Sequence, residues 1–274
     1  MLATARDITC VLAARDEARR IANVLRQVAR AGVMRVSLCV NGATDGTLAA
    51  ARRTASELEL ELTATEFAKA LGHDAPRAIA AMEAWRRWPH AHGLLLVDAD
   101  WQGSFGPMLS DFIQDALCHP ASITGVCGRV QAPDLDRLWE RIVRRAGAPA
   151  ALRPFLLPQL IPLSTFTRVS PRFAASPGLF FALTRRSAIA WRAYEAWDGR
   201  LVGNPARSAQ EQAQVLEILR EDARAAERAL FGGAGDPPPL WPGLRNWREV
   251  EAWMSQIRVD TPLLATARGD QDLV

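Results

Sequence analysis

One stretch decides the fold: Gly93-Leu94-Leu95-Leu96-Val97-Asp98-Ala99-Asp100, an apolar run that ends in two carboxylates one residue apart. The apolar run predicts a buried strand that delivers both carboxylates at its carboxyl end. In an open parallel α/β sheet, ligands bind at that end of the strands. Two carboxylates there can hold a hard divalent cation that also binds phosphate oxygens. The alternative interpretation is a strand-end turn, where Asp is common in any protein.

Strand-like and helix-like segments alternate around this stretch. Apolar or alternating segments predict further strands over 8–14, 34–40, 58–65 and 121–130. Helical periodicity predicts helices over 16–31, 48–57, 75–88, 107–118 and 134–146. Strands and helices that alternate at this pace predict the α/β class, a mostly parallel central sheet flanked by helices and joined by right-handed crossovers.

The chain after residue 131 is less regular. The Pro-interrupted apolar segment 153–162 is expected to pack as an irregular loop. A Gly-rich turn followed by a strand is predicted over 178–184, with a helix from Arg185, and a long charged helix over 208–230. Residues 231–239 predict a linker, which precedes a short Trp-bearing helix (246–257) and a polar tail.

The composition is that of an ordinary soluble globular protein, with 49% hydrophobic and 23% charged residues. A net charge of +3 is too small to indicate a nucleic-acid partner. Cys10 and Cys39 lie in predicted core strands, and the four cysteines indicate no disulfide framework, which favours a cytoplasmic location. No signal peptide and no apolar run long enough to span a bilayer is expected.

Four loops should open at one edge of the predicted sheet: 13–17, 41–47, 72–77 and 98–100. Arg77 and the helix N-termini suit phosphate, whereas Asn41 and Glu17 suit a base or ribose. Asp100 suits Mg²⁺ or Mn²⁺ that bridges a diphosphate. The converging loops therefore predict a nucleotide site.

Each of these residues also has a plainer interpretation. Asp16 is a candidate cap of the first helix and Asp45 of the second, where a cap contributes about 1 kcal/mol. Arg77 is equally compatible with a solvated helix surface. His73 is either a metal ligand or an exposed loop residue.

The order of these motifs resembles the family 2 type of GT-A glycosyltransferases. That family shows Pro-x-x-Asn-Glu, then Asp-Asp-Gly-Ser-Thr-Asp, then Asp-x-Asp, where this chain has 13–17, 40–47 and 98–100. Residues 72–77 are similar to its Gly-x-x-Ala-Ala-Arg element. Residues 178–186 are similar to its acceptor-side strand, Gly-x-Phe-x-Ala-x-Arg-Arg. The resemblance covers roughly residues 6–220 and implies a nucleotide-diphospho-sugar transferase three-layer sandwich.

The resemblance implies transfer of a sugar from a nucleotide-diphosphate sugar to a hydroxyl acceptor. Glu17 would lie near the ribose or base, Asn41 near the base, and Asp98 near the ribose and donor sugar. Asp100, with Asp98, would hold Mn²⁺ or Mg²⁺, which stabilises the departing diphosphate. The remaining substrate-binding candidates are Ala13, Arg15, Asp45, Arg77 and Arg185. Residues 1–130 would form the donor-binding half and 131–230 the acceptor-side half of one domain, followed by the linker, helix and tail of 231–274.

The chain departs from this pattern at several positions. Asn41 replaces an acidic residue, Ala13 replaces Pro, and Asp16 replaces Asn. The inverting members carry a Glu-Asp pair whose Asp is the general base. The nearest match here is Ala209-Gln210-Glu211-Gln212, in which Glu211 is a candidate base, and Asp198 is a second one. A solvated helix residue or a turn former is the alternative for each. No His follows residue 119, which excludes a late histidine as metal ligand.

The acceptor, the partners and two other functions stay open at this level. Four arginines of the acceptor-side half could bind a phosphate or carboxylate acceptor: Arg168, Arg172, Arg185 and Arg186. The segment 153–163 leaves a lipid-linked acceptor and a membrane-peripheral location open, and a homodimer is open as well. A nucleotidyltransferase would need a Gly-rich first loop with Arg and Lys, whereas Lys69 is the sole lysine. The incomplete Glu-Asp element and the tryptophans of the C-terminal segment would fit a non-catalytic binding protein.

Overall fold

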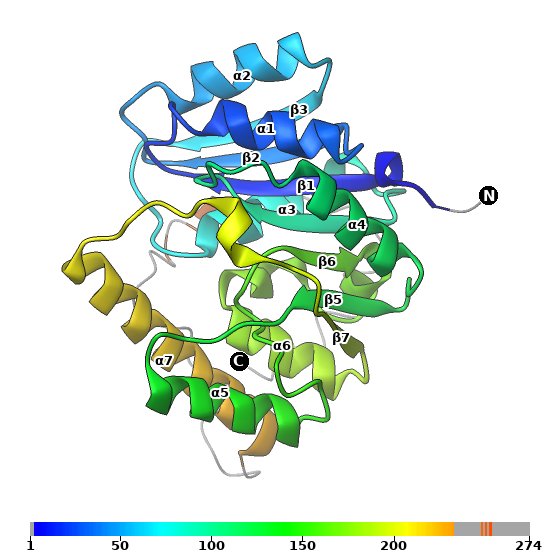
Figure 1. The fold of residues 1–274 in the computed structure, drawn as a ribbon, viewed down its shortest axis with the longest axis vertical. Helices are drawn as coiled ribbons and strands as arrows, with labels where there is room; N and C mark the ends of the chain where they lie inside the picture. Colours follow the sequence, from blue (N-terminus) through cyan, green and yellow to red (C-terminus); the bar gives the residue numbers. More distant parts are fainter. Residues whose placement is uncertain (1–2, 233–247, 249, 251, 254–274) are drawn as a thin grey trace.

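The computed structural model describes residues 3–232, 248, 250 and 252–253, and these form one seven-stranded sheet with helices on both faces (Figure 1). The strand order is β3-β2-β1-β4-β6-β5-β7. The strands are β1 (Ile8–Ala14), β2 (Arg35–Asn41), β3 (Glu61–Phe67), β4 (Gly93–Asp98), β5 (Ser122–Val126), β6 (Gln159–Pro162) and β7 (Ala190–Tyr194). Only β6 runs antiparallel to its neighbours, so the other six strands of this sheet end at the same edge.

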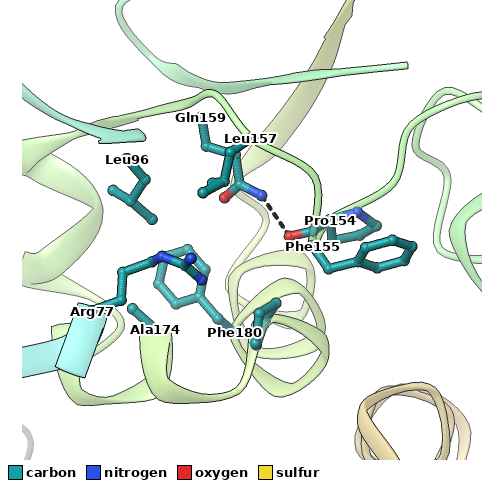
Figure 2. Close-up of a pocket in the computed structure, with 9 residues that line it drawn as sticks. Arg77, Leu96, Pro154, Phe155, Leu157, Gln159, Ala174 and Phe180 are labelled. Atoms are coloured by element: carbon teal, nitrogen blue, oxygen red, sulfur yellow. Dashed lines mark hydrogen bonds between the residues drawn. The ribbon is translucent and has the colours of Figure 1, made fainter. Parts of the chain in front are cut away.

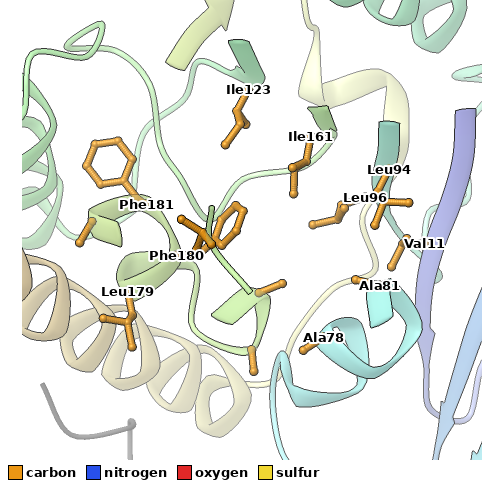
Figure 3. Close-up of a cluster of buried hydrophobic side chains, with 14 of the residues drawn as sticks. Val11, Ala78, Ala81, Leu94, Leu96, Ile123, Ile161, Leu179, Phe180 and Phe181 are labelled. Atoms are coloured by element: carbon orange, nitrogen blue, oxygen red, sulfur yellow. The ribbon is translucent and has the colours of Figure 1, made fainter. Parts of the chain in front are cut away.

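Two hydrophobic cores lie on the two faces of the sheet, which makes a three-layer structure. One core contains α1 (Ile21–Arg30), α2 (Thr47–Glu57) and α4 (Gly106–Leu117). The other contains α3 (Ala75–Arg87), α5 (Pro133–Arg145), α6 (Pro177–Arg186) and α7 (Ala209–Phe231), and part of it is drawn in Figure 3. Short 3₁₀ turns complete the chain: η1 (Ala5–Asp7), η2 (Leu163–Thr167), η3 (Pro171–Ala175) and η4 (Gly199–Val202).

The predicted α/β class and the mostly parallel sheet are confirmed. Strands β1, β2 and β4 begin and end within one residue of their predicted bounds. Their apolar side chains are needed on both faces, because each strand is covered by helices on both sides. Cys10 and Cys39, one on each face, are fully buried as expected.

The segment 153–162 is not all irregular loop, contrary to the prediction. Its last residues form β6, which inserts between β4 and β5. The Gln159 side chain supports the turn before it by donating hydrogen bonds to the carbonyl oxygens of Pro154 and Leu156. Four residues are too few to show the alternation that predicts a strand.

The strand predicted over 178–184 and the helix predicted from Arg185 are both wrong. Residues 177–186 form α6, and the strand comes later, as β7. Ser176 caps α6 by accepting a hydrogen bond from the Leu179 amide. Gly178 permits a close crossing, because a Cβ there would lie 2.2 Å from the Asp222 carbonyl oxygen of α7. The run is apolar all round because α6 is buried, and such a run does not distinguish a strand from a helix.

The predicted helix over 208–230 is confirmed as α7. In the part of the chain that the structure describes, no helix combines the length and apolar character needed to cross a membrane. Nearly all of the predicted linker, and most of the helix and tail predicted beyond it, lie outside the described residues.

Candidate active site

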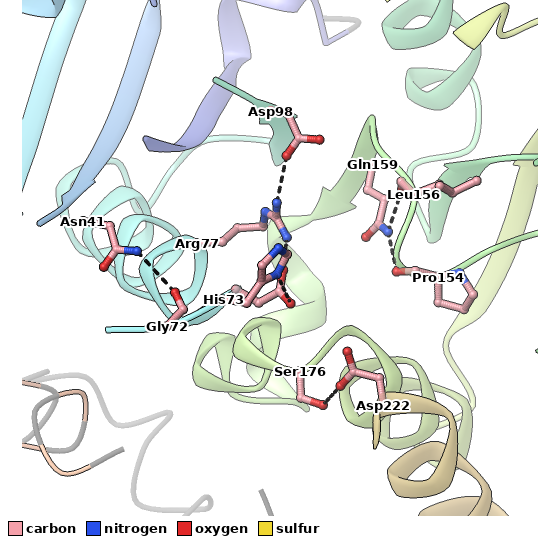
Figure 4. A network of polar contacts seen from close by, with 11 residues as sticks. Asn41, Gly72, His73, Arg77, Asp98, Pro154, Leu156, Gln159, Ser176 and Asp222 are labelled. Carbon is pink, nitrogen blue, oxygen red and sulfur yellow. Dashed lines mark hydrogen bonds and ion pairs between the residues drawn. The ribbon is translucent and has the colours of Figure 1, made fainter. Parts of the chain in front are cut away.

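The carboxyl ends of β2, β1 and β4 lie side by side at one edge of the sheet. In the strand register, Ala13 of β1 stands between Cys39 of β2 and Asp98 of β4. The loops after these strands therefore meet, as the sequence predicts, and the loop before α3 joins them through Asn41 and Arg77 (Figure 4).

Asp16 and Asp45 tie the first two loops together. Asp16 Oδ1 accepts a 2.8 Å hydrogen bond from the Thr44 amide, and Asp45 Oδ2 accepts one of 2.9 Å from the Ala18 amide. Asp16 is not the cap of the first helix, because α1 begins only at Ile21. Asp45 does support the start of α2, since its Oδ1 accepts from the Thr47 amide at 3.0 Å. The two aspartates thus hold the loops after β1 and β2 in place relative to each other.

The Glu17 carboxylate lies next to these loops and pairs with Arg20 at 2.8 Å. Burial raises the pKa of Glu17 above its ordinary value, against the opposing effect of Arg20. Arg15 is exposed and lies 3.8 Å from Asp16, whereas Ala13 is half-buried within β1.

The Asn41 side chain binds the loop that precedes α3. Its Oδ1 accepts a 2.6 Å hydrogen bond from the Leu71 amide, and its Nδ2 donates one of 3.2 Å to the Gly72 carbonyl oxygen. The next residue, Gly42, has a φ of +66°, and a Cβ there would lie 2.6 Å from the Ala70 amide nitrogen. Contact of Asn41 with a base therefore stays a prediction, whereas its contact with the loop is present.

Arg77 is a buried cation between two carboxylates, which rules out a solvated helix surface. Its side chain is 12% exposed and donates to Asp74 and, over 3.0 Å, to Asp98 Oδ1. Burial disfavours its charge, but Asp74 and Asp98 outweigh burial and hold the pKa of Arg77 above its ordinary value. His73 Nδ1 lies 3.0 Å from the other Asp74 oxygen. Figure 4 shows this network beneath the end of β4.

Asp100 differs from the other carboxylates at this edge. Its Oδ1 is buried and has no hydrogen-bond partner within the described part of the chain. Burial and the nearby charge of Asp98 raise the pKa of Asp100, against the charges of Arg207 and Arg20. A buried acceptor without a donor is costly, and a bound cation would remove this cost.

Asp98 and Asp100 can hold Mg²⁺ or Mn²⁺ only if a bound molecule supplies further oxygen ligands. No three acidic, His or Cys residues of the described chain are grouped to hold a metal. Mg²⁺ is commonly held by one or two carboxylates, with phosphate oxygens and water as the other ligands. Asp100 and Asp98 match this donor set. His73 contacts Asp74 and belongs to no metal-binding group among these residues.

A later segment, residues 197–208, lies against the loop after β4, and we call it the strap. The Val202 carbonyl oxygen accepts hydrogen bonds from the amides of Gln102, at 3.0 Å, and Gly103, at 2.9 Å. Trp197 packs on Trp101 with ring centroids 5.7 Å apart. In Figure 1 the strap is the yellow segment between β7 and α7.

The sequence does not predict that the strap belongs to the site. The only sequence signal at the contact is a pair of glycines, Gly103 and Gly203. Gly203 has a φ of +64°, and a Cβ there would lie 3.0 Å from the Gly103 amide nitrogen.

Both candidate general bases, Asp198 and Glu211, form hydrogen bonds with residues close to them in the chain. Asp198 forms a two-pronged ion pair with Arg200, and hydrogen bonds from Arg200 lower the pKa of Asp198 to about 2. Glu211 forms a capping box with Ser208 at the start of α7, and these hydrogen bonds lower the pKa of Glu211. A strongly ionised, engaged carboxylate is a poor proton acceptor near neutral pH.

Arg185 is not brought to this site. It stands at the end of α6, next to the start of β7, which is the opposite edge of the sheet from Asp98. Its guanidinium donates to the carbonyl oxygens of Ala146, at 2.9 Å, and Ile189, at 2.8 Å. Arg186 similarly donates to the Ala229 carbonyl oxygen. Both arginines thus bind backbone carbonyls near helix ends.

A small pocket lies beneath the edge, between Arg77, Gln159 and Phe180 (Figure 2). Its free volume is about 10 Å³, room for one water molecule at most. The pocket is therefore too small to hold a sugar as it stands.

Comparison with solved structures identifies the architecture. Glucosyl-3-phosphoglycerate synthase from Mycobacterium tuberculosis, solved with Mg²⁺ and uridine diphosphate, superimposes with a TM-score of 0.56 at 15% identity, covering 84% of this chain and 83% of that one. This chain has a GT-A glycosyltransferase fold. The same synthase with Mn²⁺ and UDP-glucose gives 0.54 at 14% identity, covering 84% and 83%. Its complex with phosphoglyceric acid gives 0.54 at 15% identity, covering 80% and 82%.

Comparisons of sequence add nothing to this result. No protein-family model matches the chain, and no curated protein sequence does. At 14–16% identity, the likeness to these solved structures shows the fold alone.

Proposed function

We propose that this protein transfers a sugar from a nucleoside-diphosphate sugar to a hydroxyl acceptor with the help of Mn²⁺ or Mg²⁺. The single observation that supports this most is the buried Asp100 Oδ1, without a hydrogen-bond partner in the described chain, at the carboxyl end of β4 beside Asp98. The neighbours of the same fold, solved with UDP and Mg²⁺ or with UDP-glucose and Mn²⁺, support the same ligand classes.

In this proposal Asp100, with Asp98, holds the cation, which stabilises the charge that develops on the departing diphosphate. Arg77 fixes Asp98 by binding one of its oxygens, which leaves the other for the cation or the donor sugar. The hydrogen bonds that Asp16 and Asp45 accept hold the loops after β1 and β2 together. Glu17 and Asn41 belong to this part of the chain and would lie next to the ribose and base.

We place the donor over residues 1–130 and the acceptor against the acceptor-side half, residues 131–230. The acceptor hydroxyl would attack the anomeric carbon of the donor sugar while the bond to the diphosphate oxygen breaks, and the hydroxyl proton would pass to the departing diphosphate or to water. We do not assign a general base to Glu211 or Asp198, because each carboxylate is engaged in a contact of its own.

The test is a panel of UDP-, GDP- and ADP-sugars with Mn²⁺, measured by thermal shift and by release of nucleoside diphosphate. We expect one donor class to raise the melting temperature of the natural protein and to be hydrolysed slowly without acceptor. Asp100→Asn should abolish both effects. Asp134→Asn removes an exposed carboxylate from the start of α5 and is the matched control, which should behave as the natural protein.

Three results would contradict the proposal. The absence of both shift and hydrolysis with every donor would exclude the donor class. Pyrophosphate release from a nucleoside triphosphate and a sugar phosphate would indicate a nucleotidyltransferase instead. Donor binding without transfer to any hydroxyl acceptor and without hydrolysis would indicate a binding protein on this fold.

A further inference from the structure

Gln159 is a buried amide close to the edge of the sheet where Asp98 emerges. It begins β6, and in the antiparallel register with β4 it stands opposite Leu96, two residues before Asp98. Gln159 is only 4% exposed. Its amide nitrogen is engaged within the preceding turn, because Nε2 donates to the carbonyl oxygens of Pro154 and Leu156. The amide oxygen, Oε1, therefore points away from that turn.

Arg77 faces Gln159 across the small pocket beneath this edge (Figure 2). Both Nη atoms of Arg77 are occupied, one by Asp74 and the other by Asp98. Its Nε is buried and has no hydrogen-bond acceptor in the described part of the chain. Among the same residues Gln159 Oε1 accepts no hydrogen bond, and Figure 2 shows this oxygen on the side of the amide that is turned toward Arg77. The pocket thus has a donor on one wall and an acceptor on the other.

The size and the lining of the pocket suit one water molecule. Its free volume is about 10 Å³, close to the room that a single water needs. Most of the remaining lining is apolar and includes Leu96, Ala174 and Phe180. A buried N–H without an acceptor is costly. A water that accepts from Arg77 Nε and donates to Gln159 Oε1 would satisfy both groups at once.

We propose that a buried water molecule joins Gln159 to Arg77, and that Gln159 acts through this contact as a positioning residue for Asp98. In this arrangement Arg77 is held on three sides, by Asp74, Asp98 and the water. Because Arg77 Nη2 lies 3.0 Å from Asp98 Oδ1, the direction of the guanidinium sets the direction of the Asp98 carboxylate. The inference rests on the proposed function, in which Asp98 contacts the cation and the donor sugar. It links the turn over residues 154–158, on the acceptor side, to a carboxylate of the donor site.

Two measurements on the full chain test the inference. A high-resolution crystal structure should show one water within hydrogen-bonding distance of Arg77 Nε and Gln159 Oε1. Calorimetry with UDP, GDP and ADP, each with Mn²⁺, measures the affinity to which Asp98 contributes. For the nucleotide that binds best, Gln159→Met should weaken binding about threefold to tenfold, the usual effect of one lost hydrogen bond.

Ala174→Val separates the role of the water from that of the turn. The larger side chain fills the pocket, while both hydrogen bonds from Gln159 Nε2 stay in place. Nucleotide binding should weaken as it does in Gln159→Met. Ala175→Val is the matched control, since Ala175 is fully buried next to Ala174 but does not line the pocket. Overpacking destabilises both valine variants, whereas only Ala174→Val should lose nucleotide affinity.

A double-mutant comparison tests whether Gln159 acts through Arg77. Arg77→Lys keeps a cation between Asp74 and Asp98 but lacks the Nε atom, so Gln159→Met should cause no further loss of affinity on this background. An equal loss on both backgrounds would show that Gln159 supports only the turn, and would overturn the inference. A pocket without a water in the crystal structure, or an unchanged affinity in Ala174→Val, would overturn it as well.

Nucleotide binding by the natural protein separates the inference from the proposed function. If the natural protein binds one of the nucleotides with Mn²⁺ and one of these contrary results is obtained, only the inference fails. If it binds none of the three nucleotides with Mn²⁺, the proposed function fails, and the positioning role of Gln159 fails with it.

Discussion

Arg77 Nη2 donates a 3.0 Å hydrogen bond to Asp98 Oδ1, and this contact joins the first turn of α3 to the end of β4. The same guanidinium binds Asp74, whose side chain is 5% exposed and whose backbone has a φ of +60°. Arg77 and Asp98 are 21 positions apart in the chain. The contact therefore orients a candidate donor-binding carboxylate and also neutralises a buried one.

Arg77→Ala should lower the free energy of unfolding by about 3–5 kcal/mol, because it removes the cation that lies against the buried Asp74 carboxylate. Chemical denaturation measures this loss. Arg86→Ala is the control, since Arg86 is 52% exposed and its pair with Glu83 should contribute about 1 kcal/mol or less. Equal losses in the two variants would show that the Arg77 network does not stabilise the fold.

Asp100→Asn should stabilise the protein at neutral pH, although it removes the proposed metal ligand. Burial and the charge of Asp98 raise the pKa of Asp100 in the folded state, so the folded protein retains this proton more readily than the unfolded chain does. Stability from this group is present below the ordinary Asp pKa of 3.8 and is lost as the pH rises through the raised value.

Thermal melts between pH 3 and 8 test the direction in which the stability changes with pH. The melting temperature of Asp100→Asn should exceed that of the natural protein at pH 7, and the difference should shrink toward about pH 3.8. Asp134→Asn should show no such gain. A lower melting temperature for Asp100→Asn at pH 7 would mean that Asp100 has a stabilising partner.

Gly178→Ala should destabilise the protein by about 1–3 kcal/mol, the usual cost of overpacking. An alanine in an exposed helix would instead be more stable than glycine by about 1 kcal/mol, so a loss reports the crossing of α6 with α7. Gly199→Ala is the matched control, because a Cβ there has no neighbour within 4 Å. Stabilisation by Gly178→Ala would show that the two helices can separate freely.

Glu211→Gln and Asp198→Asn should leave sugar transfer within a few-fold of the natural rate, while Asp100→Asn abolishes it. Hydrogen bonds from Ser208 lower the pKa of Glu211, and hydrogen bonds from Arg200 lower the pKa of Asp198. Any stability that either carboxylate contributes is therefore present above the ordinary carboxyl pKa and is lost on acidification. Loss of kcat by a hundredfold or more in one variant, with donor affinity unchanged, would identify that residue as the base after all.

Long apolar strands were predictable because burial on both faces requires continuous apolar sequence, as in β1 and β4. The convergence of the loops after these strands followed from parallel pairing, which places all carboxyl ends at one edge. Short elements and fully enclosed elements were not predictable, because their apolar pattern does not distinguish a strand from a helix or a loop. β6 has only four residues, and α6 is apolar all round because the sheet and α7 enclose it.

Individual side-chain roles were harder to predict than the elements that position them. Asp16 and Asp45 were candidate caps, but Asp16 does not cap α1, and each of the two accepts a hydrogen bond from a backbone amide of the other loop. Arg185 followed a motif of the acceptor side, yet α6 leads it to the opposite edge, where β7 begins. Glu211 stands where the motif places a base, but Ser208 three residues earlier completes a capping box.

The sequence by itself determined the α/β class, the strands that form the sheet centre and the edge where Asp98 and Asp100 emerge. These follow from local patterns, namely apolar runs, helical periodicity and the order of strand and helix. Only the tertiary structure decided that Arg77 pairs with Asp98, that the strap lies against the loop after β4, and that Asp100 keeps a buried oxygen without a partner among the described residues. Such contacts join residues far apart in the chain, and they depend on the distance and direction at which side chains meet after packing.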